Sequence, residues 1–87
     1  MINSVIMHEK DTVVTVTEAV SIGEDVSYNV NGQIFTVKAI SNIPIYHKIA
    51  VKSIKKGSEV FKYGERIGYA TVDISKGDHV HVNNLDS

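Results

Sequence analysis

Two histidines near the end of the chain, His79 and His81, have a spacing that could support chemistry. Their segment reads as a strand, and residues two apart in a strand share a face, so we expect both imidazoles to line up with the side chain of Asn83. Val80 and Val82 are then expected to point the other way, into the core. Paired imidazoles on one face can bind a divalent metal or position a substrate carboxylate. The alternative is an exposed, chemically inert pair.

Two further pairs carry groups suited to substrate binding or proton transfer. His47 and Lys48 are adjacent, so in an extended segment their side chains point to opposite faces. Lysine can anchor a carboxylate, and histidine can act as an acid or a base. Near the start of the chain, His8 and Asp11 could form an Asp–His hydrogen bond. For both pairs the alternative is a solvated surface position.

The segment that contains Lys62 and Tyr63 is a third candidate. Tyr63 could pack in the core with its hydroxyl at the rim. Gly64 and Gly68 indicate a turn at which the backbone could come close to a ligand, and a tight hairpin is the alternative.

The elements that must position these groups read as strands. Residues 12–17 are all β-branched, which suits a pleated surface. Asn31-Gly32 lies between two apolar runs and predicts a hairpin tip, because both central residues of such a turn need positive φ. Many short strands with no convincing helix of ten residues or more favour an all-β, compact barrel or clip-like fold. The expected strands are 12–17, 27–30, 34–40, 48–54, 59–63, 69–74 and 78–83; residues 43–51 could instead contain a helical turn after Pro44.

A short pattern recurs in the chain: an apolar residue, a glycine three positions later and a valine three positions after that. The copies are Val20-Gly23-Val26, Ile54-Gly57-Val60 and Ile74-Gly77-Val80. We interpret each copy as strand, turn and strand, with the glycine in a strained turn position and the valine buried. Three independent turns of a common type would give the same pattern.

Length and composition limit the class of protein. The 87 residues are expected to form one small domain spanning 1–87. Nine basic and ten acidic residues, without a basic stripe, argue against a dedicated nucleic-acid surface. There is no cysteine, no apolar run of membrane-spanning length and no signal-peptide pattern, so we expect a cytoplasmic domain that completes its core against a partner.

Several of the residues above belong to short motifs that follow one another along the chain. On them the chain resembles the small N-terminal SAF-type domain of the altronate and galactarate dehydratase family, and its stand-alone relative, the small subunit of sulfolactate sulfo-lyase. The resemblance covers nearly the whole chain. It rests on His8 and Asp11, Ile43-Pro44, His47-Lys48-Ile49-Ala50, Lys62-Tyr63-Gly64, Ile67-Gly68, Asp73-Ile74, Gly77, His79-Val80-His81 and Asn84.

The resemblance implies a β-clip (SAF-like) fold and a lyase that acts on sugar acids. In such a reaction water leaves a polyhydroxy carboxylate to give a 2-keto-3-deoxy acid; in the sulfo-lyase branch bisulfite leaves instead. A large dehydratase subunit is expected to hold much of the catalytic machinery and most of a divalent metal site, with iron as the expected metal. We therefore expect a small hydro-lyase subunit that is inactive alone. Alternatives are a sulfolactate sulfo-lyase small subunit, or a non-catalytic module that binds a carbohydrate acid or a protein.

The resemblance also implies roles for individual residues. His47 and His81 are the expected acid–base groups, and His79 with His81 the expected metal-binding pair. We expect the polar residues 47, 48, 62, 63, 79 and 81 to converge on one open surface. The residues expected to bind substrate are Lys48, Lys62, Tyr63, His8 and Asp11.

Three positions depart from the family pattern. Tyr46 stands where the family has glycine, Thr12 replaces an asparagine, and Asn83 replaces a histidine. An amide is a weaker transition-metal ligand than an imidazole, so the last change weakens a metal site formed by this face alone.

Overall fold

Every regular element in the described chain is a strand. The computed structural model of the protein describes residues 4–5 and 11–86. The described residues contain no helix, and therefore none able to cross a membrane. The predicted all-β fold is confirmed. The strands are β1 (Ser4–Val5), β2 (Val13–Val16), β3 (Asp25–Val30), β4 (Gln33–Lys38), β5 (Lys48–Ala50), β6 (Glu59–Lys62), β7 (Glu65–Ala70), β8 (His79–Val80) and β9 (Leu85–Asp86).

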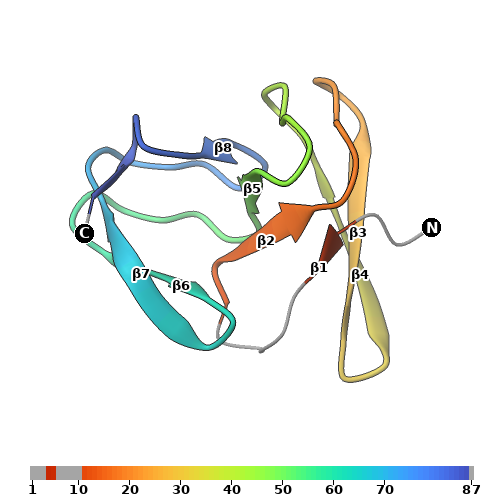
Figure 1. Ribbon diagram of the computed structural model, residues 1–87, viewed down its shortest axis with the longest axis horizontal. Helices are drawn as coiled ribbons and strands as arrows, with labels where there is room; N and C mark the ends of the chain where they lie inside the picture. Colours follow the sequence, from red (N-terminus) through yellow and green to blue (C-terminus); the bar gives the residue numbers. More distant parts are fainter. Residues whose placement is uncertain (1–3, 6–10, 87) are drawn as a thin grey trace.

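The strands form a central antiparallel sheet with a hairpin on either side (Figure 1). The central sheet has the order β1-β2-β5-β8. One hairpin is β3-β4, and the other is β6-β7 with β9 added to its edge. Strand β5 is one of the two inner strands of this sheet, and it pairs with β2 on one side and with β8 on the other.

The core is divided by the central sheet. Val14 on β2 and Ile49 on β5 pack in a cluster with residues of the β3–β4 hairpin. Val13, one position earlier on β2, packs instead in a second cluster with residues of the β6–β7 hairpin. A strand that is buried on both faces needs apolar side chains at successive positions, which explains the adjacent buried valines Val13 and Val14.

The predicted repeat forms the same turn each time. The third residues of the turns are Gly23, Gly57 and Gly77, with φ of 89°, 87° and 93°. A hydrogen bond of 2.9–3.0 Å runs from the fourth residue's N–H to the first residue's carbonyl in every copy. A positive φ confined to the third residue is typical of a type II turn. The valines at 26, 60 and 80 are fully buried, as predicted.

A fourth copy is hidden in the sequence because a tyrosine replaces its glycine. Ile43, Tyr46 and Ile49 occupy the three pattern positions, and Tyr46 has φ 66°. The N–H of His47 donates to the carbonyl of Pro44 at 3.0 Å, which closes the turn. The segment after Pro44 is therefore this turn, and not the alternative helical turn.

The four turns come in two bridged pairs. Val20 and Ile43 exchange two backbone hydrogen bonds of 2.9 and 2.8 Å, and Ile54 and Ile74 exchange two of 2.8 and 2.7 Å. These isolated bridges explain two boundary errors. The strands predicted over 48–54 and 69–74 end at Ala50 and Ala70, because a bend separates each strand from its bridge residue.

Both hairpins end in a two-residue turn with positive φ at both tip residues. Asn31 and Gly32 have φ of 53° and 85°, as the Asn-Gly signal predicts. Tyr63 and Gly64 have φ of 57° and 77°, so the tight hairpin is the correct alternative there. Gly68 takes no part in that turn, because it lies within β7.

Candidate functional site

Three histidines from two segments meet at one edge of the central sheet. His47 is the last residue of the hidden turn and directly precedes β5, whereas His79 begins β8 and His81 follows it. The ladder pairs residue 49 with 79 and residue 48 with 80, so position 47 faces position 81. The register of β5 with β8 therefore sets the three imidazoles side by side.

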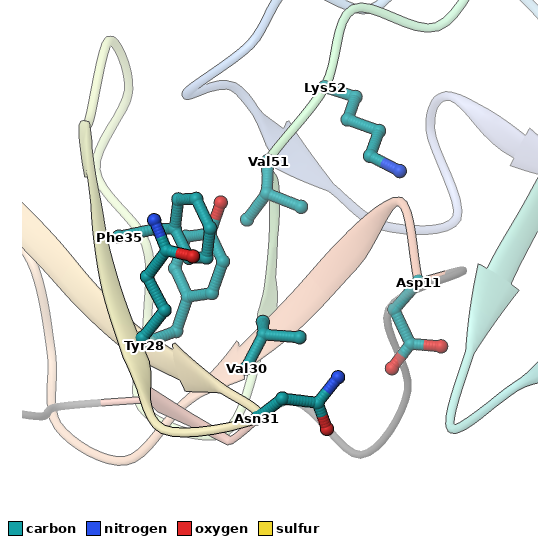
Figure 2. A pocket seen from close by; sticks show the side chains of 8 residues that line it. Asp11, Tyr28, Val30, Asn31, Phe35, Val51 and Lys52 are labelled. Atoms are coloured by element: carbon teal, nitrogen blue, oxygen red, sulfur yellow. The ribbon is translucent and has the colours of Figure 1, made fainter.

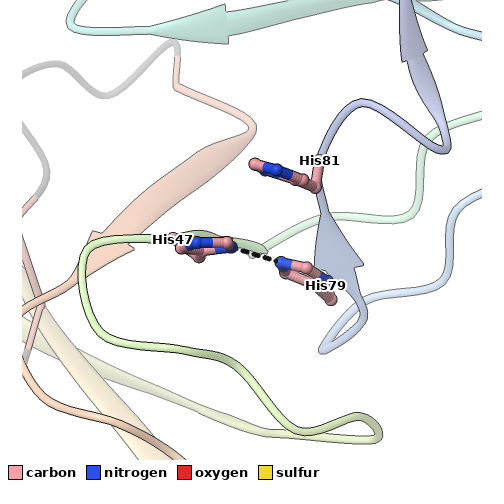
Figure 3. Close-up of side chains that lie close together, drawn as sticks. All are labelled: His47, His79 and His81. Carbon is pink, nitrogen blue, oxygen red and sulfur yellow. Dashed lines mark hydrogen bonds between the residues drawn. The ribbon is translucent and has the colours of Figure 1, made fainter.

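The imidazoles are in mutual contact (Figure 3). His47 Nδ1 lies 2.9 Å from His79 Nε2, a hydrogen bond that requires a proton on one of the two nitrogens. The ring of His81 stacks on that of His47, with 4.5 Å between centroids and 21° between planes. One ring nitrogen of each histidine lies within 4.8 Å of the others, and all three side chains are half-buried. We call residues 47, 79 and 81 the histidine cluster.

Asn84 holds the backbone that carries two members of the histidine cluster. Its side chain is buried, donating from Nδ2 to the carbonyl of His79 at 2.8 Å. Its Oδ1 accepts the N–H of His81 at 2.9 Å. Sequence reasoning quoted Asn84 only as part of a resemblance and missed this positioning role.

Asp78 fixes the start of β8. Its Oδ1 accepts the N–H of His79 at 2.8 Å and also the hydroxyl of Ser41. Because Ser41 lies far away in the sequence, this carboxylate also ties β8 to the loop after β4. Nothing in the local sequence pattern identifies that contact in advance.

The predicted orientation of Val82 and Asn83 is wrong. Strand β8 ends at Val80, and the chain then turns, with the N–H of Asn84 donating to the carbonyl of His81. Strand alternation consequently stops, and Val82 is 82% exposed instead of buried. Asn83 lines a separate cavity beside Val82, so the third imidazole of the cluster comes from His47.

The electrostatic setting of His79 favours its neutral form. Burial lowers the pKa of His79, and the neighbouring His47 and His81 lower it further, while Asp78 acts in the opposite direction. The charge of Lys48 contributes a smaller lowering of the same pKa. A neutral imidazole keeps a ring nitrogen lone pair, which a proton or a metal ion can take up.

Lys48 lies on the other side of the pleat from the histidine cluster. It pairs with Val80, whereas Ile49 pairs with His79, and neighbouring residues on a strand point to opposite faces. Burial is the largest cause of a lowered Lys48 pKa, and the positive charge of Lys62 is the second. The charge of Lys62 therefore acts on Lys48, and the charge of Lys48 acts on His79, although Lys48 is not part of the histidine cluster.

Asp11 secures the tip of the β6–β7 hairpin. It is 1% exposed, and its two carboxylate oxygens accept the N–H groups of Tyr63 and Gly64 at 2.9 and 2.7 Å. Of the two readings of Tyr63, a core position and an open surface, the core position is excluded, because the side chain is 47% exposed at the hairpin tip. The Lys62 ammonium lies 4.8 Å from the centroid of the Tyr63 ring. His8, the predicted partner of Asp11, lies outside the described residues.

A cavity of about 300 Å³ lies between Asp11 and the β3–β4 hairpin (Figure 2). Tyr28 and Phe35 stack on one another in its wall, with centroids 5.6 Å apart. None of the three clustered histidines lines it. The lining residues are Asp11, Tyr28, Val30, Asn31, Gln33, Phe35, Val51 and Lys52.

The fold and the cluster define a small all-β domain with an imidazole site at an open sheet edge. Residues 2–87 match the family described as the altronate/galactarate dehydratase SAF domain. The chain therefore belongs to this SAF domain family.

Relatives of known name are of two kinds. The chain is 37% identical over 79 residues to an altronate dehydratase of Bacillus subtilis (strain 168) and 38% identical over 78 residues to one of Escherichia coli (strain K12). Each match covers 90% of this chain but only 15% of the relative, so the chain spans a small part of these enzymes. A (2R)-sulfolactate sulfo-lyase subunit alpha of Chromohalobacter salexigens is 33% identical over 84 residues, with 92% of this chain and 89% of that subunit covered.

Proposed function

We propose that this chain is the small, SAF-type component of a lyase that removes water from a polyhydroxy carboxylate of the altronate or galactarate type. The larger part of the active site would come from a partner subunit or domain. The observation that carries this proposal is the histidine cluster, which lies half-buried at a sheet edge and combines residues from two distant segments. Asn84 and Asp78 hold the backbone of one of these segments. Family membership supplies the class of reaction.

The proposed reaction makes specific chemical demands. A base takes the proton bound to the carbon next to the carboxylate, and the bond between the next carbon and its hydroxyl breaks. That hydroxyl leaves with a proton as water, and the resulting enol rearranges to a 2-keto-3-deoxy acid. The enzyme must therefore hold the carboxylate and stabilise the negative charge that develops on its oxygens.

Residues near the cluster match these demands. Lys48 projects from the opposite face of β5, but its charge acts on His79, so its half-buried ammonium would bind the substrate carboxylate at the border of the cluster. His47 and His81 are the candidates for proton transfer or for binding the reacting oxygens. Lys62 and the exposed Tyr63 would border the same site when a partner covers it.

The proposal can be tested on the complex with a large dehydratase subunit. The two chains would be purified together and assayed with altronate and galactarate. We expect turnover by the complex and none by this chain alone. His81→Ala and Lys48→Met should each lower kcat/KM by at least about tenfold, while Lys55→Met, which removes an exposed lysine from a distant turn, should leave it unchanged.

Two results would contradict the proposal. One is a complex that forms but turns over no hydroxy acid, which would favour a non-catalytic binding module. The other is full activity in the His81 and Lys48 variants. Circular dichroism of each variant separates loss of activity from loss of fold.

A second reaction has its own support. The chain covers 89% of one sulfo-lyase subunit alpha and aligns with 75% of another, from Paracoccus pantotrophus, at 46% identity over 50 residues. A stand-alone chain of this length therefore has a precedent among subunits that carry that name. In this reaction a carbon–sulfur bond breaks and bisulfite leaves. Release of sulfite from sulfolactate by the same complex would favour it over dehydration.

A further inference from the structure

We propose that two copies of this chain associate through the outer edge of β4, so that their β3–β4 hairpins form one four-stranded antiparallel sheet. The hairpin lies at one side of the molecule and is a sheet of only two strands (Figure 1). A sheet of two strands is marginally stable and gains from further strands. The proposal concerns the association of the chain with itself, so it can fail while the proposed lyase activity holds.

The register of the hairpin leaves backbone groups of β4 directed away from β3. Val30 and Gln33 flank a two-residue tip, and they form a pair that exchanges backbone hydrogen bonds. Such pairs alternate along the ladder with pairs that exchange none, so the N–H and carbonyl groups of Ile34 and Thr36 point outward. Among the residues that the structure describes, no strand pairs with β4 on that side, and no backbone hydrogen bond joins these four groups to another segment.

The central part of β4 has none of the features that usually protect an edge strand. Natural sheet edges are blunted by lysine, proline, a bulge or a covering segment. Residues 33–37 contain no charge and no proline, and their pairing with β3 is free of register shifts. Ile34 and Phe35 are both exposed. An exposed, regular and apolar edge is a surface to which another strand can add.

The outer edge of β8 shows the contrast within the same fold. Asn84 accepts the N–H of His81 and donates to the carbonyl of His79, so groups that a further strand would need are already occupied. In the part of the chain that the structure describes, no side chain does the same for β4. The hydroxyl of Thr36 lies 3.3 Å from that of Ser27, a contact within the hairpin itself.

A second copy of β4 fits this edge in an antiparallel register centred on Phe35. In that register Ile34 of each copy lies opposite Thr36 of the other. The outward groups of both strands then form four backbone hydrogen bonds. Because residues 33–37 carry no charge, the register opposes no like charges. A second copy therefore supplies both the extended backbone and the apolar side chains that this edge needs.

The ring of Phe35 would gain a second aromatic contact in this pairing. It already stacks on Tyr28, its cross-strand partner, with 5.6 Å between centroids (Figure 2). Residues directly opposite one another lie on the same face, so the two copies would form a row of four rings. The added ladder ends near Val37, because the turn at Gly77 packs against the carbonyl of Lys38. A contact this short should be weak and reversible.

Analytical ultracentrifugation of the whole chain tests for the dimer. As concentration rises, we expect the mass to rise from that of one chain to twice that value, with a Kd on the order of 0.1 mM. One double variant would carry Ile34→Lys and Thr36→Lys, and a second would carry Ile34→Glu and Thr36→Glu. Each alone sets like charges opposite one another and should weaken association by at least about tenfold. An equal mixture of the two should associate again, because each lysine then faces a glutamate.

Matched controls separate this edge from other apolar surface. Val82→Lys also adds a charge at an exposed apolar residue, but far from β4, and should leave the dimer unchanged. Circular dichroism checks that every variant keeps its fold. In the original chain, amide exchange at Ile34 and Thr36 should slow with rising concentration, because only the dimer protects these N–H groups. The N–H of Phe35, which already faces β3, should change little.

Several outcomes would overturn the proposal. One is a chain that stays monomeric up to about 1 mM, roughly ten times the expected Kd. Another is a dimer that both double variants form as well as the original chain, since association would then use a different surface. The same holds if the mixture of the two variants fails to associate. Amides at 34 and 36 that are equally protected at low concentration would show that one copy covers this edge by itself.

Discussion

Tyr46 occupies, in the turn before β5, the position that Gly77 occupies in the turn before β8. Both have positive φ, 66° for Tyr46 and 93° for Gly77. The N–H of Tyr46 donates to Val16 and that of Gly77 to Ala50, in both cases to a strand residue of the central sheet. The turn with Tyr46 leads to His47, and the turn with Gly77 leads to His79. The first turn has a strained backbone because a non-glycine residue has positive φ, whereas glycine adopts this conformation without strain in the second.

Replacement of Tyr46 by glycine should stabilise the protein. A left-handed conformation costs an ordinary residue about 1–2 kcal/mol, which exceeds the roughly 0.5–1 kcal/mol entropic cost of glycine. The tyrosine side chain is 71% exposed, so little packing is lost with it. We expect the free energy of unfolding, measured in urea, to rise by about 0.5–1 kcal/mol. A decrease would show that the ring makes a contact worth more than the backbone strain.

Alanine at two equivalent glycines should have unequal effects. An added Cβ at Gly57 meets nothing within 4 Å, so Gly57→Ala carries only the cost of positive φ, about 1–2 kcal/mol. At Gly77 the same atom would collide with the carbonyl oxygen of Lys38. Gly77→Ala should therefore cost about 3 kcal/mol or more. Equal losses in urea unfolding would contradict the close packing of the β8 turn against residue 38.

Asn84→Ala should affect both the stability and the histidine cluster. The change removes two buried hydrogen bonds and leaves the backbone groups of His79 and His81 without them, a cost of about 2–3 kcal/mol. Asn83→Ala, on the exposed neighbour, should cost under about 0.5 kcal/mol. The ring signals of His79 and His81 should broaden or shift only in the first variant. Unchanged signals would mean that Asn84 does not position the cluster.

Asp11→Asn separates a structural from a substrate-binding role. An amide presents an NH₂ to one of the two backbone N–H groups that Asp11 accepts, so we expect a loss of about 1–3 kcal/mol of stability. Activity of the assembled complex at low temperature should survive wherever the variant remains folded. A loss of substrate affinity without a loss of stability would instead support the predicted binding role.

Stability should fall at alkaline pH because of Tyr28. Burial raises the pKa of this phenol above its ordinary value of about 10. As the pH rises past that value, the unfolded chain releases the proton while the folded chain keeps it, so the unfolded state is favoured. Tyr28→Phe should flatten this decline in urea unfolding between pH 9 and 11 (about one unit either side of the ordinary value). A decline that persists unchanged would show that Tyr28 is not its cause.

Local signals in the sequence account for the parts of the fold that were predicted correctly. The Asn31-Gly32 tip and the glycine turns are identified by residues that tolerate positive φ, a property of a few adjacent positions. The fourth turn was missed because Tyr46 carries no such signal. The predicted orientations of Val82, toward the core, and of Asn83, toward the two histidines, were wrong because nothing local reveals that β8 stops after two residues.

The histidine cluster was only partly predictable for a related reason. The spacing of His79 and His81 marks a pair, but the contact of His47 with His79 spans 32 positions. That contact depends on the register of β5 with β8, which follows from the packing of the whole core. Asn84 and Asp78 act through backbone groups, and side chains in such roles have no distinctive spacing.

The pairing of β5 with β8 has a consequence for how the protein folds. Both hairpins join strands that are adjacent in the chain, whereas the β6–β7 hairpin separates β5 from β8 in the sequence (Figure 1). Contacts between distant segments form slowly, because a long loop must close before they contribute. We therefore expect the three imidazoles to assemble in a late step. In a chain caught before that step the three histidines would lie apart, so contact among their rings reports the completion of folding.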